Sequence, residues 1–166
     1  MAKNDKKKAK EENGDRTIVV NRKARYAYDI EESLEAGLAL TGTEVKSARA
    51  GHVQIAEAYA KIESGPQARP EMWIVGMHIA PYEQGNRFNV EARRTRKLLL
   101  RRDQIDKLNA RVAQKGYTIV PLKLYFTRGK AKLELGVGRG RKAHDKREAI
   151  SERDTRRDVQ RQIAER

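Results

Sequence analysis

The chain has 166 residues, no cysteine and a formal net charge of +14. Its length suits one ordinary domain with an extension. The lack of cysteine excludes disulfides, thiolate zinc sites and cysteine nucleophiles, and fits a reducing compartment such as the cytoplasm. Basic side chains release counterions from phosphates, so nucleic acid is the expected partner. No long apolar span is present and no apolar segment follows the basic N-terminus, so we expect neither membrane anchor nor signal peptide.

The first 16 residues are rich in lysine and nearly free of large apolar groups. Such a segment cannot offset the entropy lost on ordering, so we expect a flexible N-terminal extension. Residues 17 to 137 carry apolar residues mostly in short runs separated by glycine or proline, as strands do. The core begins at TIVVNRKARYAYDI. The predicted extended segments are AYDIEESLEAGLAL around a kink, the alternating AEAYAKIE and the short apolar strand MWIVGMHI. A long polar loop, PYEQGNRFNVEARR, follows.

One segment of the core has a helical period. In RRDQIDKLNARVAQKG, Ile105, Leu108 and Val112 lie on one helical face, Asp103 can cap the start, and Gly116 stands where a helix would end. We therefore predict a helix there and a second, shorter one in TEVKSARAG.

The end of the core predicts a hairpin. YTIVPLKLYF and KAKLELGV flank a turn at Arg128-Gly129, and in the second run apolar residues alternate with Lys132, Glu134 and Gly136. This alternation is typical of a sheet with one wet face. The fold class is therefore mainly β: a small antiparallel barrel of the oligonucleotide-binding (OB) type with peripheral helices. Periodicity alone leaves a mixed sandwich open.

Residues 138 to 166 form a basic C-terminal tail that begins in the glycine-rich GVGRGRK. This stretch lacks the GK[ST] ending and the following helix of a phosphate loop, so we interpret its glycines as a hinge. Residues 145 to 166 have a capping pattern at Ser151 and Asp154, yet their few large apolar residues make no continuous stripe. We therefore expect a tail that is disordered alone and helical when bound.

The residues favour binding over catalysis. His52 and His78 lie in a turn and near a strand end, and His144 beside Asp145 does not make a dyad, because neighbouring side chains point in different directions. We find no catalytic residue, no metal motif and no cofactor motif. The stronger pattern is RRTRKLLLRR, residues 93 to 102, in which leucines can anchor the segment while cations face RNA. The alternative is a basic, solvated rim.

Several motifs together resemble one family. NRKARYAYDIEESLEAGLALTGTEVKSARAG, RTRKLLL, IDKL with KGYTIVPLKLYF, KLELGVGRGRK and DKR occur in the order and spacing of small protein B, the SsrA-binding proteins of bacterial trans-translation. The resemblance runs from about residue 18 to residue 153. It departs from the family pattern at Thr43, where tryptophan is frequent, at Ala92-Arg93, and in SERDTRRD, which lacks a tryptophan.

The resemblance implies an OB-type barrel that is not an enzyme and binds the tRNA-like domain of transfer-messenger RNA. It implies delivery of that RNA to stalled ribosomes, with the tail probing the empty mRNA channel and the decoding centre. Elongation factor Tu would be a partner through the charged RNA, and the protein would be a monomer. The runner-up is a structural ribosomal or assembly protein bound permanently to ribosomal RNA.

The resemblance also places the family's site residues on this chain. The RNA-binding positions are Asn21, Arg22, Glu35, Arg94, Arg96, Lys97 and Leu99. The decoding-centre positions are Gly140, His144, Asp145, Lys146 and Arg147.

Overall fold

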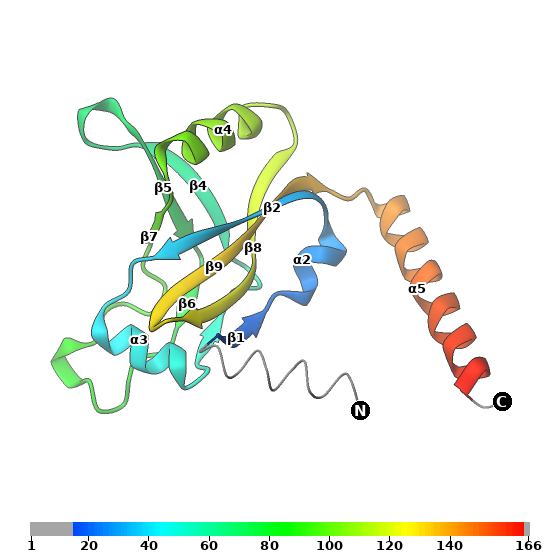
Figure 1. The fold of residues 1–166 in the computed structure, drawn as a ribbon, viewed down its shortest axis with the longest axis horizontal. Coiled ribbons are helices and arrows are strands. Elements are labelled where there is room, and N and C mark those ends of the chain that lie inside the picture. The colour runs from blue at the N-terminus through cyan, green and yellow to red at the C-terminus, as the bar shows by residue number, and fades with distance from the viewer. Residues whose placement is uncertain (1–14, 165–166) are drawn as a thin grey trace.

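The computed structural model describes residues 15–164, and strands dominate it (Figure 1). The strands are β1 (Arg16–Val20), β2 (Tyr28–Leu38), β3 (Val53–Gln54), β4 (Tyr59–Ser64), β5 (Pro70–Val75), β6 (His78–Ile79), β7 (Arg96–Leu99), β8 (Tyr117–Thr127) and β9 (Lys130–Gly140). The helices are α2 (Arg22–Ala27), α3 (Gly42–Arg49), α4 (Arg102–Val112) and α5 (Ala143–Ala164), with 3-10 turns η1 (Pro66–Ala68) and η2 (Asn86–Phe88). The predicted mainly β class is confirmed. The predicted N-terminal extension lies outside the described residues up to residue 14.

The main sheet closes on itself as a barrel. Its order is β1-β8-β4-β5-β7-β2-β9, and β8 also pairs with β9. All these pairs are antiparallel, and the β4–β8 seam consists of one residue pair, Ala60 with Ile119. β3 and β6 form a separate two-stranded sheet. The predicted antiparallel barrel is therefore confirmed.

Two apolar clusters lie on opposite sides of the β2, β8 and β9 layer. The barrel interior contains the larger cluster, which includes Met72, Ile74, Leu98, Leu124 and Leu135. The smaller cluster packs Ala24 of α2 against Val120 and Leu122 of β8. The long hairpin of β8 and β9 is thus buried on both faces over part of its length, which explains the unbroken apolar run in its sequence.

Most predicted elements are present, with instructive differences at their boundaries. The turn at Arg128-Gly129 is confirmed, and both residues have positive φ as a two-residue hairpin requires. MWIVGMHI is two strands instead of one, because the chain bends at Gly76. A Cβ there would lie 2.9 Å from the carbonyl oxygen of Glu57, and φ is +78°. Only glycine suits this bend.

Helix α2 is not predicted from the sequence, in which the apolar residues of the core lie mostly in short, strand-like runs. Asn21 caps this helix, because its Oδ1 accepts a hydrogen bond from the backbone N–H of Ala24 at 3.1 Å. Asn21 followed by the good helix formers RKARYA was the available signal. The helix is six residues long, too short for a helical period to stand out.

The glycine hinge is a correction. β9 continues to Gly140, and Gly136, Gly138 and Gly140 are all strand residues paired with β2. A Cβ on Gly138 would lie 2.0 Å from the carbonyl oxygen of Asp29, so close strand approach is the reason for glycine at this position. The junction with the tail is therefore at residues 141–142.

Helix α5 projects away from the barrel (Figure 1). Its contacts with the rest of the chain involve α2. The tail is helical and begins at Ala143 instead of residue 145. Its disorder in the absence of a partner stays a prediction. Within residues 15–164, no helix combines the length and apolar character needed to cross a membrane.

Candidate nucleic-acid interface

The structure brings Glu35, Lys97 and Leu99 together at one hollow of about 610 Å³. β2 and β7 are neighbours in the sheet, and Gly37 is paired with Leu99. A Cβ on Gly37 would lie 3.1 Å from that of Leu99, so the glycine makes room for the leucine. Leu99 is 54% exposed, whereas Leu98 is buried in the barrel. The leucine run therefore anchors β7 through one residue and presents the next to solvent.

Glu35 is held as an ionised acceptor. The Tyr125 hydroxyl donates a hydrogen bond to its Oε2, and Lys132 Nζ lies 2.9 Å from its Oε1. The Tyr125 hydrogen bond, followed by that from Lys132, lowers the pKa of Glu35 below its ordinary value. Burial, together with the bond to Glu35, raises the pKa of Tyr125. Tyr125 and Lys132 were missed as site residues, although the alternation along their strands places both on the wet face.

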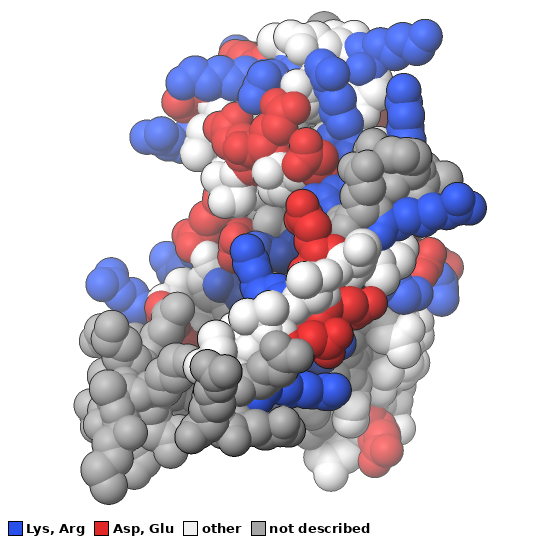
Figure 2. Space-filling view, turned by 90° about the vertical axis from the view of Figure 1, so that its right-hand side faces the viewer, with Lys and Arg blue, Asp and Glu red and all other residues white. Residues whose placement is uncertain are grey.

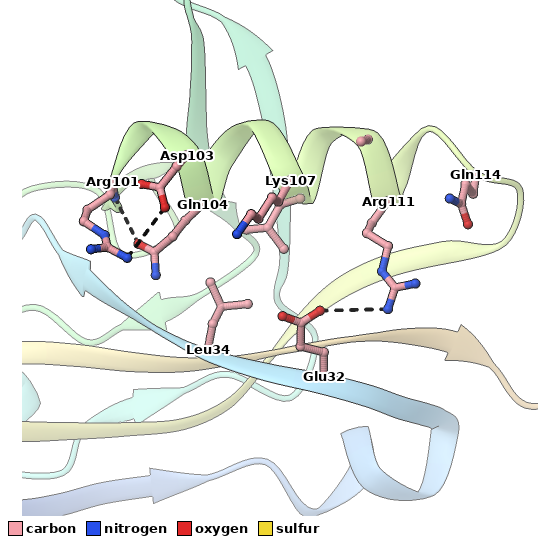
Figure 3. A pocket seen from close by; sticks show the side chains of 10 residues that line it. Glu32, Leu34, Arg101, Asp103, Gln104, Lys107, Arg111 and Gln114 are labelled. Atoms are coloured by element: carbon pink, nitrogen blue, oxygen red, sulfur yellow. Dashed lines mark hydrogen bonds and ion pairs between the residues drawn. The ribbon is translucent and has the colours of Figure 1, made fainter.

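A second hollow of about 530 Å³ adjoins the first, between β2 and α4 (Figure 3). Arg101 and Gln104 line both hollows. We call the two together the β2 groove. Lys107 points from α4 toward β2 above Leu34 and makes no hydrogen bond or ion pair with any described residue. A cation without a partner at the edge of an apolar surface is suited to a phosphate.

Other cations of the β2 groove already have partners. Lys97 Nζ lies 2.6 Å from Glu71 Oε1 and 5.7 Å from the centre of the Trp73 ring. Arg111 Nη2 lies 3.9 Å from Glu32 Oε2 across the hollow. These ion pairs are partly exposed, so a phosphate can compete for either cation at modest cost.

Arg96 is not at the surface, which corrects its assignment as an RNA-contacting residue. Its side chain is 0% exposed. Its Nε donates to Glu44 Oε1 at 2.8 Å, and its Nη1 donates to the carbonyl oxygens of Met77 at 2.7 Å and Arg94 at 3.0 Å. Its Nη2 donates to Ala92 at 2.9 Å. The guanidinium therefore ties the segment before β7 to the barrel and to α3.

Glu44 is the centre of this buried network. Arg94 Nη2 lies 2.6 Å from its Oε2, and the backbone N–H of Thr41 donates to the same oxygen at 2.9 Å, which caps α3. Burial alone would raise the pKa of Glu44, but the bonds from Arg94, Thr41 and Arg96 outweigh it and lower that pKa. Arg94 remains partly exposed, so it stays a candidate for RNA contact at its outer edge.

Asn21 and Arg22 lie apart from the β2 groove, at α2. Asn21 is buried, and its Nδ2 donates to the carbonyl oxygens of Pro121 at 3.0 Å and Ile55 at 3.3 Å. Its amide is fully used in holding α2 against the barrel. Arg22, the first residue of α2, is exposed. Of this pair, Arg22 alone can reach RNA directly in this structure.

The surface charge is not uniform. On the face that includes α5, Lys and Arg side chains project around the edges, while Asp and Glu gather in the upper half (Figure 2). Glu31 forms an ion pair with Arg111 and accepts a hydrogen bond from the Tyr117 hydroxyl. No group of three or more potential metal ligands occurs in the part of the chain that the structure describes.

The residues predicted for the decoding centre lie where the barrel gives way to the tail. Gly140 is the last residue of β9 and is exposed. His144, Asp145 and Lys146 belong to the first turns of α5, and their side chains lie outside the described part of the structure. Arg147 is exposed. These residues fall within an eight-residue stretch of the chain that starts at the end of β9.

The chain is similar to known proteins over nearly all of its length. The family model described as "SmpB protein" matches residues 18–165. The SsrA-binding protein of Acetivibrio thermocellus is 52% identical over 157 residues, 95% of this chain and 97% of that protein. The SsrA-binding protein of Desulfitobacterium hafniense is 53% identical over 148 residues, 89% of this chain and 92% of that protein. A solved structure described as "tmRNA-SmpB: a journey to the center of the bacterial ribosome" has a TM-score of 0.63 and 48% identity, over 80% of this chain and 93% of that chain.

Proposed function

This chain belongs to the SmpB protein family, and we propose on that premise that it binds the tRNA-like domain of transfer-messenger RNA and delivers it to stalled ribosomes. Its relatives are named SsrA-binding proteins, and the similar solved structure is described with tmRNA and the bacterial ribosome. The net charge of +14 supports a polyanionic partner. The proposed activity is binding, without a chemical step or a cofactor.

One observation carries the RNA-binding part of the proposal: Glu35, Lys97 and Leu99 meet in the β2 groove. Leu99 offers apolar surface to a base or ribose, and Lys97 and Lys107 offer charge to phosphates. Glu35 can accept a hydrogen bond from a base or a sugar hydroxyl, since its pKa is lowered and it stays ionised. The buried Arg96 then supports this surface by holding β7 in place.

We assign the tail to the ribosome. α5 has 22 residues, a rod about 33 Å long at about 1.5 Å per residue. Its described side chains are exposed, including the large apolar Ile150, Val159 and Ile163. A basic helix with no apolar face to bury in its own chain suits a channel lined with RNA, such as an empty mRNA channel. Gly140 and residues 144–147 would then lie at the decoding centre.

The partners in this proposal are transfer-messenger RNA, the small ribosomal subunit and, through the charged RNA, elongation factor Tu, with the protein acting as a cytoplasmic monomer. The contrasting possibility is a structural ribosomal or assembly protein bound permanently to ribosomal RNA. Sedimentation of ribosomes separates the two. We expect a sub-stoichiometric protein whose association needs transfer-messenger RNA, and a stoichiometric protein on all ribosomes would contradict the proposal.

The RNA-binding face is tested by Leu99→Asp. This change places a carboxylate against RNA phosphates, so the affinity for transfer-messenger RNA should fall at least about tenfold. Val159→Asp is the matched control, because Val159 is similarly exposed but lies in α5. Electrophoretic mobility shifts with free RNA measure both. Equal affinities for the two variants would place the RNA elsewhere.

The tail is tested by ending the chain after Lys142, beyond the last residue of β9. The shortened protein should bind free transfer-messenger RNA like the full chain, yet should fail to support peptide tagging on stalled ribosomes. A shortened protein that also loses RNA binding would contradict the division between barrel and tail.

A further inference from the structure

A third hollow, which we call the α3 pocket, lies away from the β2 groove and from α5. Its volume is about 430 Å³, and it lies between α3 and the 80–95 loop, on the side of the barrel away from α5 (Figure 1). Thr43 and Lys46 line it from α3, and Tyr82, Gln84 and Phe88 line it from the loop. None of these residues belongs to the RNA-binding face or the tail described above.

The aromatic wall of the α3 pocket is exposed, and its backbone is held by hydrogen bonds. Phe88 is 68% exposed. Its backbone carbonyl accepts a hydrogen bond from Thr43 Oγ1 at 3.2 Å, and its N–H donates to Gly85 at 2.9 Å. Asn89 closes the loop by bonding the backbone N–H and carbonyl of Tyr82 at 2.9 and 2.8 Å. Because the loop backbone is already held, a flat ligand that stacks on Phe88 has to order the ring but not the loop.

The 80–95 loop is also tied down at both ends. Ser47 Oγ donates to the carbonyl of Ala80 at 2.6 Å at its start. Near its end, Arg94 Nη2 bonds Glu44 Oε2 at 2.6 Å. The buried Glu44 network therefore holds the pocket's two walls, α3 and the loop, in one arrangement.

The charge around the α3 pocket is positive. Lys46 Nζ lies 5.5 Å from the centre of the Tyr82 ring, and Arg87 Cζ lies 5.2 Å from the centre of the Phe88 ring. The residues that line the pocket include no carboxylate. Glu83 lies next to Tyr82 in the chain but is not among them. Aromatic faces next to cations are the combination that binds bases by stacking and phosphates by charge.

We propose that the α3 pocket binds one unpaired RNA nucleobase, which stacks on Phe88 or Tyr82 while Lys46 and Arg87 neutralise the adjoining phosphate. The pocket would give the protein an RNA contact on the side opposite α5, separate from the β2 groove. An apolar peptide would not use the two cations, and an acidic peptide would not use the exposed ring.

Photo-crosslinking with a short single-stranded RNA tests this proposal directly. The full-length protein is mixed with hexauridylate containing 5-iodouridine, irradiated and digested, and the crosslinked residue is identified by mass spectrometry. We expect crosslinks at Phe88 or Tyr82. Crosslinks confined to other exposed aromatic residues, such as Tyr59, would overturn the proposal.

Substitutions separate stacking from general charge attraction. Phe88→Leu keeps an apolar side chain but removes the ring, so the pocket crosslink should disappear and the affinity of this site should fall by roughly 5- to 150-fold. Phe88→Tyr should retain both the pocket crosslink and the affinity, because it keeps an aromatic ring. Lys46→Gln should flatten the slope of log affinity against log salt by about 0.7. Lys115→Gln should not, because Lys115 is an exposed lysine in the turn after α4. Unchanged crosslinking and affinity in Phe88→Leu would also overturn the proposal.

The test does not depend on transfer-messenger RNA. Leu99→Asp should lose affinity for transfer-messenger RNA and keep the hexauridylate crosslink in the α3 pocket. If the crosslink persists while Leu99→Asp binds transfer-messenger RNA normally, the proposed RNA binding at the β2 groove is wrong, whereas nucleobase binding in the α3 pocket is supported. If the crosslink is absent while Leu99→Asp behaves as expected, the pocket fails alone.

Discussion

The barrel and helix α5 are both rich in cations but hold them differently. In the barrel, the Arg96 side chain is completely buried and donates hydrogen bonds to Glu44 and to three backbone carbonyl groups. Lys132 forms an ion pair with Glu35. In α5, Arg153 and Arg156 are exposed and bond no described residue. The barrel's cations are therefore partly structural, whereas those of α5 are available to a partner.

The apolar residues of α4 and α5 differ in the same way. Ile105 and Leu108 of α4 are buried against the barrel. Val159 and Ile163 of α5 are exposed. Because tertiary packing supplies most of a helix's stability, α4 is stable as part of the fold, and the stability of α5 has to come from what it binds.

The largest effect that tests this comparison is expected from Arg96→Ala. The change leaves Glu44 with one cation fewer and leaves buried carbonyl groups without a donor. Removing one partner of a buried ion pair costs about 3–5 kcal/mol, so the free energy of unfolding should fall by that amount in urea denaturation.

Two arginines are controls for Arg96→Ala. Arg93 is exposed three residues earlier and bonds no described residue, and Arg156 is its counterpart in α5. Either change to alanine should alter the free energy of unfolding by less than about 0.5 kcal/mol. Equal losses in the free energy of unfolding for Arg96→Ala and Arg156→Ala would contradict the distinction between structural cations in the barrel and available cations in α5.

A smaller effect is expected where β9 leads toward α5. Gly138→Ala brings a Cβ within 2.0 Å of the Asp29 carbonyl oxygen, so the strands have to separate at a cost of about 1–3 kcal/mol. Gly140→Ala is the matched control, because nothing lies within 4 Å of its Cβ. Thermal unfolding compares the two. If Gly138→Ala leaves stability unchanged and alters tagging on ribosomes instead, the glycine is a hinge after all.

The smallest effect concerns Glu35. Tyr125→Phe removes the hydrogen bond that contributes most to lowering the pKa of Glu35, so that pKa should rise toward its ordinary value of 4.5. Side-chain carboxyl NMR during an acid titration measures this directly. An unchanged pKa would show that Lys132 alone holds the carboxylate.

The same variant has a predictable dependence of stability on pH. A carboxyl whose folded pKa is lowered stabilises the fold above its unfolded pKa, and loses this contribution as the pH falls through the folded pKa. Tyr125→Phe should therefore be less stable than the natural protein above about pH 4.5, by less than about 1 kcal/mol because Glu35 is half exposed. The difference should shrink below that pH.

Sequence reasoning found part of the candidate interface. Glu35, Lys97 and Leu99 came from the resemblance, and the structure places them at one groove. The alternating pattern of β9 was a signal for Lys132 as a further site residue, because it places Lys132 on the wet face of the sheet. Arg96 was wrongly expected at the surface, because the motif RRTRKLLLRR does not indicate which of its cations has a buried partner. The partner of Arg96 is Glu44, 52 residues away in the chain.

The sequence by itself determined the features that depend on composition or on residues close together in the chain. These are the net charge, the helical period of α4, the turn at Arg128-Gly129 and a tail with no apolar stripe. These features follow from neighbouring residues and need no partner elsewhere in the chain. Only the tertiary structure decided which polar groups are buried. Asn21, read as a site residue, reaches the carbonyl of Pro121, 100 residues away. Once the barrel closes, a buried amide or guanidinium has to satisfy its hydrogen bonds within the protein, and barrel closure is a property of the whole chain.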